Sequence, residues 1–169
     1  MQLSQSRGFT MIELLVVVAI MTILMGLVLS SFDLSRERSR DNKRISDLQL
    51  ISLSLEQYKT NCLEYPNRLD ASANNGCAIG INFGNFINPI PVDPKTNDPY
   101  NYFVYSQSST NRCLRYHLWT KLEKDREISQ NDSNFNSSNI ITIPCTTSSG
   151  QSPIDGNIPE IYDIHSSDR

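Results

Sequence analysis

The chain has 169 residues and a formal net charge of −3, which allows one domain with a modest core. There is no excess of basic residues, so the sequence predicts no nucleic-acid partner. Nearly all of the continuous apolar sequence lies within the first 32 residues, and the remainder is polar and rich in Asn and Ser. This asymmetry predicts an apolar anchor followed by a water-soluble head.

An uncharged apolar run extends from Leu14 to Phe32. As a helix rising ~1.5 Å per residue it would be roughly 28 Å long, about the thickness of the hydrocarbon core of a bilayer. A cleaved secretory signal peptide fits poorly, because its apolar part is shorter and ends at a small-residue site that Ser30–Asp33 does not provide. A buried core helix also fits poorly, because the run has no polar face. We therefore expect residues 9–32 to cross a membrane.

The small residue that a peptidase would require stands before the run, where Gly8 follows Arg7 and precedes Phe9. A cut after Gly8 would remove residues 1–8 as a leader and leave the apolar helix on the mature chain. Glu13 is costly in lipid, by up to ~3 kcal/mol near the bilayer centre, unless it lies in the headgroup region. The cut would create an α-ammonium on Phe9, and this charge could neutralise Glu13 when helices pack side by side with a stagger.

The segment from Arg7 to Leu14 (Arg-Gly-Phe-Thr-Met-Ile-Glu-Leu) resembles the class III signal of type IV prepilins and type II secretion pseudopilins. The resemblance implies that a prepilin peptidase cuts between Gly8 and Phe9 and that Phe9 is then N-methylated. It also implies that Glu13 guides assembly by meeting the N-terminal amine of a neighbouring subunit. The implied partners are identical or related pilin subunits, the prepilin peptidase, an inner-membrane assembly platform and the cytoplasmic membrane.

The charges that flank the run bear on the orientation of the chain. Only Arg7 and the α-amine precede the run, whereas five basic residues follow it: Arg36, Arg38, Arg40, Lys43 and Arg44. This balance alone would place the head in the cytoplasm. The leader motif and the cysteines favour a head outside, so we expect a single-pass protein of the cytoplasmic membrane that later enters a cell-surface or periplasmic filament.

The helix is expected to continue past the run, from about residue 9 to residue 60. Four apolar residues recur at spacings of three and four and line one face: Leu48, Ile51, Leu55 and Tyr58. Residues 33–60 are therefore predicted to be an amphipathic continuation that packs on a sheet in the head. Residues 61–99 are dense in Pro, Asn, Gly and Asp, which predicts a loop region. Within it, Pro91-Val92-Asp93-Pro94 resembles the loop-to-sheet junction of pilins and major pseudopilins.

Residues 100–152 are predicted to form a small antiparallel sheet, which gives an α+β fold with the long helix packed on it by its second half. Strand character at Tyr100–Tyr105 and Cys113–Leu122, with a polar turn between them, predicts a hairpin, and a third strand is predicted at Ile140–Pro144. Alternation in the second strand should turn one set of residues to the helix (Leu114, Tyr116, Leu118, Leu122) and the other to solvent (Arg115, His117, Trp119, Lys121). The tail, residues 153–169, is expected to be partly disordered.

Four cysteines lie in the head: Cys62, Cys77, Cys113 and Cys145. An even number without CxxC or zinc-type spacing predicts disulfides in an oxidising compartment, although free buried thiols are the alternative. Three connectivities stay open, of which pairing between sequence neighbours closes the shortest loops.

No catalytic or metal-binding motif occurs, so no enzyme and no metal site are predicted. His117 and His165 are expected at the surface. The one cofactor that stays open is Ca²⁺, for which the tail offers Asp155, Glu160 and Asp163. Some major pseudopilins bind calcium in a late loop, but the spacing here matches no such loop.

The predicted function is that of a structural subunit of a type IV pilus-like filament, processed by prepilin peptidase and assembled through its N-terminal helix. The alternatives are a pseudopilin of a type II secretion system and a membrane-anchored binding domain that never polymerises. The sequence does not choose between adhesion, motility, DNA uptake and secretion, or between a major and a minor subunit.

Overall fold

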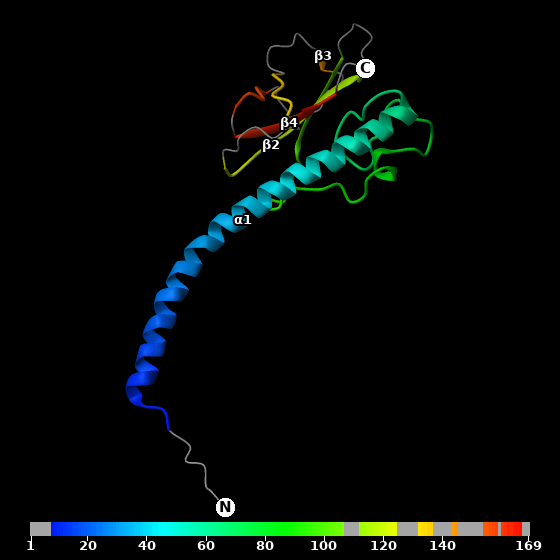
Figure 1. The fold of residues 1–169 in the computed structure, drawn as a ribbon. Helices are drawn as coiled ribbons and strands as arrows, with labels where there is room; N and C mark the ends of the chain where they lie inside the picture. Colours follow the sequence, from blue (N-terminus) through cyan, green and yellow to red (C-terminus); the bar gives the residue numbers. More distant parts are fainter. Residues whose placement is uncertain are drawn as a thin grey trace, which may run out of the picture. The chain divides into compact units, whose positions relative to one another are not determined.

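The computed structural model describes residues 8–106, 112–124, 132–136, 143–144, 154–158 and 160–166. In chain order its elements are α1 (Met11–Cys62), the short 3-10 helix η1 (Phe83–Asn85), and the strands β1 (Asn101–Ser106), β2 (Arg115–Lys121), β3 (Ile143–Pro144) and β4 (Ile161–His165) (Figure 1). The chain divides into two compact units, Met1–Glu37 and Arg38–Arg169, and α1 contributes to both.

The long predicted helix is confirmed, because α1 runs without interruption from Met11 to Cys62. The segment contains no proline, and its one glycine, Gly26, is compatible with a helix at a modest cost. The helix ends where Leu63 adopts the left-handed region (φ 64°) and donates its N–H to the carbonyl oxygen of Lys59 (2.8 Å). The predicted loop region follows, and its described residues contain no helix or strand other than η1.

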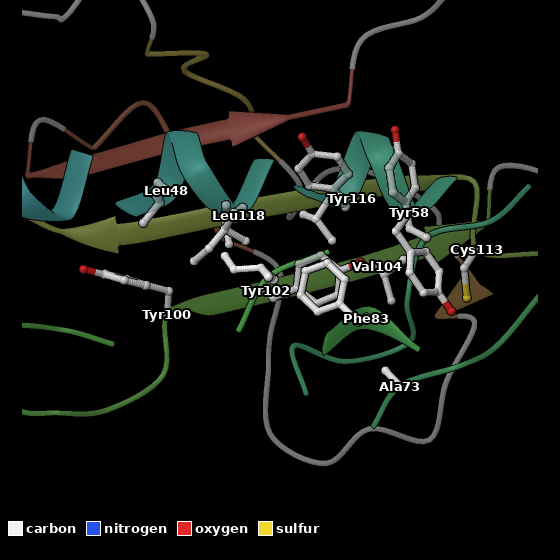
Figure 2. Close-up of a cluster of buried hydrophobic side chains, with 14 of the residues drawn as sticks. Leu48, Tyr58, Ala73, Phe83, Tyr100, Tyr102, Val104, Cys113, Tyr116 and Leu118 are labelled. Atoms are coloured by element: carbon white, nitrogen blue, oxygen red, sulfur yellow. The ribbon is translucent and has the colours of Figure 1, made fainter. Parts of the chain in front are cut away.

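The core of the head lies between α1 and one face of the sheet. The four residues of the predicted helix stripe are fully buried, and β1 and β2 place Tyr102, Val104, Tyr116 and Leu118 against them (Figure 2). The loop between the helix and the sheet completes this core with Phe83 and Ala73. Tyr58 meets Phe83 edge to face, with ring centroids 5.8 Å apart. The α+β class and the amphipathic second half of the helix are therefore confirmed.

Within the described residues, the four strands form one antiparallel sheet in the order β3-β1-β2-β4. The predicted hairpin is confirmed by the pairing of β1 with β2, whereas its turn at residues 107–111 lies outside the described residues. The predicted third strand is present at Ile143–Pro144 and pairs with β1. The sequence did not predict β4. Tail residues 161–165, expected to be partly disordered, pair with β2 along its length.

The outer face of the sheet differs from the prediction. His117 and Trp119 were expected in solvent, but they are 0% and 5% exposed. The cause is a second layer, in which Phe135 and Ile154 pack onto a cluster of buried outer-face residues: Phe103, Tyr105, Trp119 and Ile161. Of the residues predicted to face solvent, only Lys121 at the end of the strand is exposed. Leu114, which was predicted to face the helix, lies before the strand and is half-buried.

Candidate assembly site

The junction between Gly8 and Phe9 precedes the helix and is accessible. Both residues have non-helical backbone and are exposed, and the Phe9 side chain is 81% exposed. A Cβ added to Gly8 would meet no atom within 4 Å, so packing in this fold does not require glycine there. Residues 1–7 lie outside the described residues.

Glu13 lies in the first turn of α1 and interacts with Thr10 at the start of the helix. The Thr10 backbone N–H (3.4 Å) and hydroxyl (3.3 Å) both donate to Glu13 Oε2, and the Glu13 N–H donates to Thr10 Oγ1 (3.3 Å). This is the reciprocal arrangement of a capping box, which satisfies N–H groups that have no partner within the helix. The Thr-x-x-Glu spacing is the sequence signal from which this arrangement could have been predicted. Glu13 thus has a local structural role in addition to the role that the prepilin resemblance implies.

The first turns of α1 carry a continuous apolar surface. From Met11 to Met25 every large apolar side chain is exposed, with exposed fractions from 43% at Val17 to 92% at Met11. A surface of this kind on a folded chain marks a site that lipid or another protein covers. Among the described residues, no helix reaches the combined length and mean hydropathy required of a membrane crossing, so the predicted span at residues 9–32 is not confirmed.

A buried charge cluster joins the second half of α1 to the head. The guanidinium of Arg44 is 4% exposed and contacts Asp41 (2.7 Å), Asp93 (2.6 Å) and Glu123 (2.9 Å). Arg40 adds a bidentate pair with Glu123 (2.6 and 2.7 Å). Two of the five basic residues that follow the apolar run, Arg40 and Arg44, are therefore paired with carboxylates that lie outside the helix.

Hydrogen bonds within this cluster shift the pKa values of its members. The bond from Arg44 lowers the pKa of the Asp93 carboxyl, and the bond from Arg40 lowers that of Glu123, in both cases against the opposing effect of burial. The pKa of Arg44 is raised, mainly by its bond to Asp93. Asp93 also accepts the backbone N–H groups of Lys95 (2.8 Å) and Thr96 (3.1 Å). The aspartate of the Pro-x-Asp-Pro segment therefore fixes its loop and ties that loop to α1.

One of the predicted disulfides is described in full. Cys62, the last residue of α1, is bonded to Cys77 in the loop region, which is the pairing between sequence neighbours. Cys113 is also disulfide-bonded, and Cys145 lies outside the described residues. The alternative of free buried thiols is wrong for the cysteines that the structure describes.

The three carboxylates considered for Ca²⁺ each have a different partner. Asp155 accepts both the backbone N–H (3.0 Å) and the side-chain amide (2.8 Å) of Asn157. Glu160 pairs with Lys121 (2.6 Å), and Asp163 is buried against His117 (2.9 Å). Within the described part of the chain, no group of three or more His, Cys, Asp or Glu residues is arranged to hold a metal ion. The structure therefore does not bring these three carboxylates together as one metal-binding group in its described part, and the expectation that the chain binds no cofactor stays a prediction.

Comparison with known proteins agrees with the N-terminal motif. The sequence model of the prokaryotic N-terminal methylation motif matches residues 3–29. That motif, the long helix and the small antiparallel sheet together define a pilin-like protein.

The curated relatives narrow the class further. The chain is 33% identical over 107 residues to the type II secretion system core protein G of Aeromonas hydrophila, covering 59% of this chain and 74% of the relative. It is 32% identical over 111 residues to the protein of the same name from Pseudomonas aeruginosa, covering 62% and 78%. The Vibrio cholerae protein of that name is 28% identical over 115 residues, covering 64% and 78%. No solved structure gives a significant match.

The chain therefore belongs to the family of the type II secretion system core protein G. This membership confirms the predicted pilin and pseudopilin resemblance and the prediction that the chain is not an enzyme. It also supports the secretion pseudopilin, which was the alternative, better than the type IV pilus subunit that was our main prediction.

Proposed function

We propose that this chain is a pseudopilin of a type II secretion system. Prepilin peptidase removes residues 1–8, Phe9 is N-methylated, and the apolar half of α1 holds the subunit in the cytoplasmic membrane with the head in the periplasm. The subunit then joins a periplasmic filament of identical or related subunits on an inner-membrane assembly platform. The observation that carries this proposal is the exposed apolar surface of α1 within a prepilin-type motif, and its secretion role is supported by the similarity to the core protein G relatives.

Several features of the chain suit these steps. The exposed, non-helical Gly8–Phe9 junction is the kind of segment that peptidases cut. A filament in which each subunit repeats one head-to-tail contact stays open and grows. In such a filament, the apolar surface of α1 passes from lipid to protein contacts, and Glu13 pairs with the Phe9 amine of a neighbour. This pairing supplies the partner that an ionisable group in an apolar environment requires.

Processing is tested first by the intact mass and N-terminal sequence of the protein purified from its own membranes. We expect a chain that begins at Phe9 and carries one additional methyl group. Gly8→Val should block processing and leave the full-length chain in the membrane. A wild-type chain that still begins at Met1 would overturn the proposal, because no filament subunit would then be released from its leader.

The capping box makes a sharper test of Glu13 possible. Glu13→Gln keeps a side chain that can cap the helix but removes the charge, whereas Thr10→Ala removes the hydroxyl contacts and keeps the charge. The measurement is chemical cross-linking of subunits in the membrane. We expect Glu13→Gln and Glu13→Ala to insert in the membrane but to give no cross-linked multimers. Thr10→Ala should still give them. If Glu13→Gln assembles normally, Glu13 acts only as a helix cap.

A gene deletion in the source bacterium distinguishes a role in a secretion system from a role in a pilus. Deletion of the gene should leave secreted proteins in the periplasm, and the wild-type gene, but not its Glu13→Gln variant, should restore their release. Normal secretion together with the loss of a surface filament would overturn the secretion role and return the chain to the type IV pilus interpretation.

A further inference from the structure

The outer face of the sheet is covered by a short segment that is neither helix nor strand. This segment, residues 132–136, is called the strap below. Its Phe135 packs onto the outer-face cluster of Phe103, Tyr105, Trp119 and Ile161. Within the described residues, its single backbone bridge pairs Asn136 with Asp155. The strap also contacts the sheet, and several of these contacts involve one residue of β4.

That residue is Asp163, which is fully buried. Its backbone carbonyl accepts the N–H (3.1 Å) and the hydroxyl (3.1 Å) of Ser133, and its backbone N–H donates to Asp132 Oδ1 (3.1 Å). Its carboxylate Oδ2 accepts the backbone N–H of Phe135 (3.0 Å) and contacts His117 Nε2 on β2 (2.9 Å). One side chain thus links β2, β4 and the strap.

Two histidines of the outer face hold the aromatic ring of the strap. His117 and His165 are directly paired across β2 and β4, so both side chains project from the same face of the sheet. The Phe135 ring stacks on His165 with centroids 4.4 Å apart and meets His117 edge to face at 5.2 Å. His117 itself is 0% exposed and is bonded to Asp163, so the position of the ring depends on the same buried pair.

The space beside Asp163 is closed by a glycine. Gly156 donates its N–H to the Phe135 carbonyl oxygen (3.1 Å), and a Cβ at this position would stand 2.8 Å from Asp163 Oδ1 and 2.7 Å from that carbonyl oxygen. A methyl group there would displace the strap or Asp163, because 2.7 Å is shorter than carbon–oxygen contacts allow. Gly156 therefore offers a way to disturb the strap without changing any charge.

The strap belongs to a different apolar cluster from the helix core. The inner cluster joins α1 to Tyr102, Tyr116 and Leu118, and it shares no buried member with the outer cluster among the described residues. Asp163 Oδ1 and His165 Nδ1 are buried without a hydrogen-bond partner in the described part of the chain. Regions with few apolar contacts open before the core of a protein does.

We propose that the strap opens as a unit separate from the helix–sheet core, and that the buried His117–Asp163 pair is the latch that keeps it closed. Opening uncovers the aromatic outer face of the sheet while α1 stays packed on the inner face. The inference concerns the head alone and does not rest on the secretion role.

The chain contains a reporter for this motion, because Trp119 is its only tryptophan and lies beneath the strap. The experiment uses the full chain in detergent micelles and measures acrylamide quenching of Trp119 together with amide hydrogen exchange. Asp163→Asn removes the charge of the latch at nearly constant volume. We expect exchange of the Phe135 amide to be faster by roughly 10- to 100-fold, because bonds to charged groups contribute about 1.5–3 kcal/mol. Quenching of Trp119 should rise in parallel.

Controls separate opening of the strap from loss of the fold. Glu160→Gln removes an exposed ion pair next to β4 and should leave both measurements unchanged. Gly156→Ala and Ser133→Ala should reproduce the Asp163→Asn pattern, the latter at a smaller amplitude. In all three strap variants the amides of Leu48, Ile51 and Leu55 should stay as protected as in the wild type. Equal acceleration at these helix amides, or unchanged quenching in Asp163→Asn, would overturn the proposal.

Discussion

The two halves of α1 present the same residue types to opposite environments. Leu14 and Leu15 in the first half are 61% and 68% exposed, whereas Leu48 and Leu55 in the second half are fully buried. The second half has an apolar stripe that the chain's own sheet covers, and its other faces are mostly polar, with Leu50 and Leu53 as exposed exceptions. The first half is apolar on all sides, which a small domain cannot cover by itself. Apolar sequence alone therefore does not mark a core residue; what marks it is the presence or absence of a polar face.

This comparison predicts that head stability resides in a few residues of the second half and its partners. The largest expected effect is at Arg44, which is 4% exposed and serves three carboxylates. Arg44→Leu leaves Asp41, Asp93 and Glu123 with less counter-charge in a buried site, and should lower the free energy of unfolding by about 3–5 kcal/mol. Urea unfolding of the full chain in micelles, followed by near-UV circular dichroism of the buried tyrosines, measures this change.

The matched control for Arg44 is Arg68, whose pair with Asp70 spans 3.7 Å and is about half exposed on both sides. Arg68→Leu should leave the unfolding curve unchanged, because exposed pairs contribute little. A loss at Arg44 no larger than the loss at Arg68 would show that the buried cluster does not hold the head on α1.

The second prediction compares two leucines directly. Leu118→Ala, in the core beneath α1, should destabilise the head by about 2–5 kcal/mol through lost burial and a residual cavity. Leu15→Ala should change head stability by less than about 0.5 kcal/mol, because Leu15 belongs to the other unit and is exposed. The same Leu15 variant also tests assembly. We expect it to give fewer cross-linked multimers while the stability of the head is unchanged. A destabilised head in Leu15→Ala would contradict the division into two units.

The third prediction is that the head loses stability at acidic pH. The pKa values of Asp93 and Glu123 are held below their ordinary values of 3.8 and 4.5, mainly by hydrogen bonds from Arg44 and Arg40 respectively. Their contribution to stability is present above these ordinary values and is lost as the pH falls through the lowered ones. The urea midpoint of the wild type should therefore fall steeply below about pH 4.5. Arg44→Leu should show a shallower fall, and an unchanged pH profile in this variant would contradict the assignment.

The sequence predicts the structure correctly in segments where apolar residues recur with a single period. The buried helix stripe and the hairpin were predicted because spacings of three and four, or of two, recur among apolar residues. The stripe in fact continues toward the N-terminus as Asp41 and Arg44, seven and four residues before Leu48. Both are buried charged residues on the same helix face. Their spacing from Leu48 can be read from the sequence, but only the structure shows that Asp93 and Glu123 provide partners for Arg44.

The outer face of the sheet could not be predicted in this way. The alternation in β2 correctly divided its residues between two faces, but it does not say whether a second layer covers the polar one. The answer depends on Phe135 and Asp163. Both lie in segments without periodicity and contact β2 from 16 or more residues away along the chain. At the N-terminus the situation is reversed, because a motif indicates processing and assembly, while the fold of one chain tests neither.

The smallest expected effect is a pH dependence of the strap. Burial, and then a hydrogen bond with the Asp163 carboxylate, raise the pKa of Asp132 from its ordinary value of 3.8 to about 6. Because this pKa is raised, protonated Asp132 favours the closed strap. This contribution is fully present at pH values below the ordinary pKa of 3.8 and is lost as the pH rises through about 6. Acrylamide quenching of Trp119 should therefore increase modestly between pH 5 and pH 7 while the helix core stays folded.

Other titratable groups face the same site and require a control. Asp163 contacts Asp132, His117 and His165 lie against Phe135 of the strap, and Arg115 acts on His165 from β2. Burial lowers the pKa of His165 from its ordinary value of 6.5, so its contribution has the opposite sign and is lost as the pH falls. Asp132→Asn removes only the acidic member that loosens the strap at higher pH. In this variant quenching should stay level or decrease between pH 5 and pH 7, and an increase equal to that of the wild type would contradict the assignment of the pH dependence to Asp132.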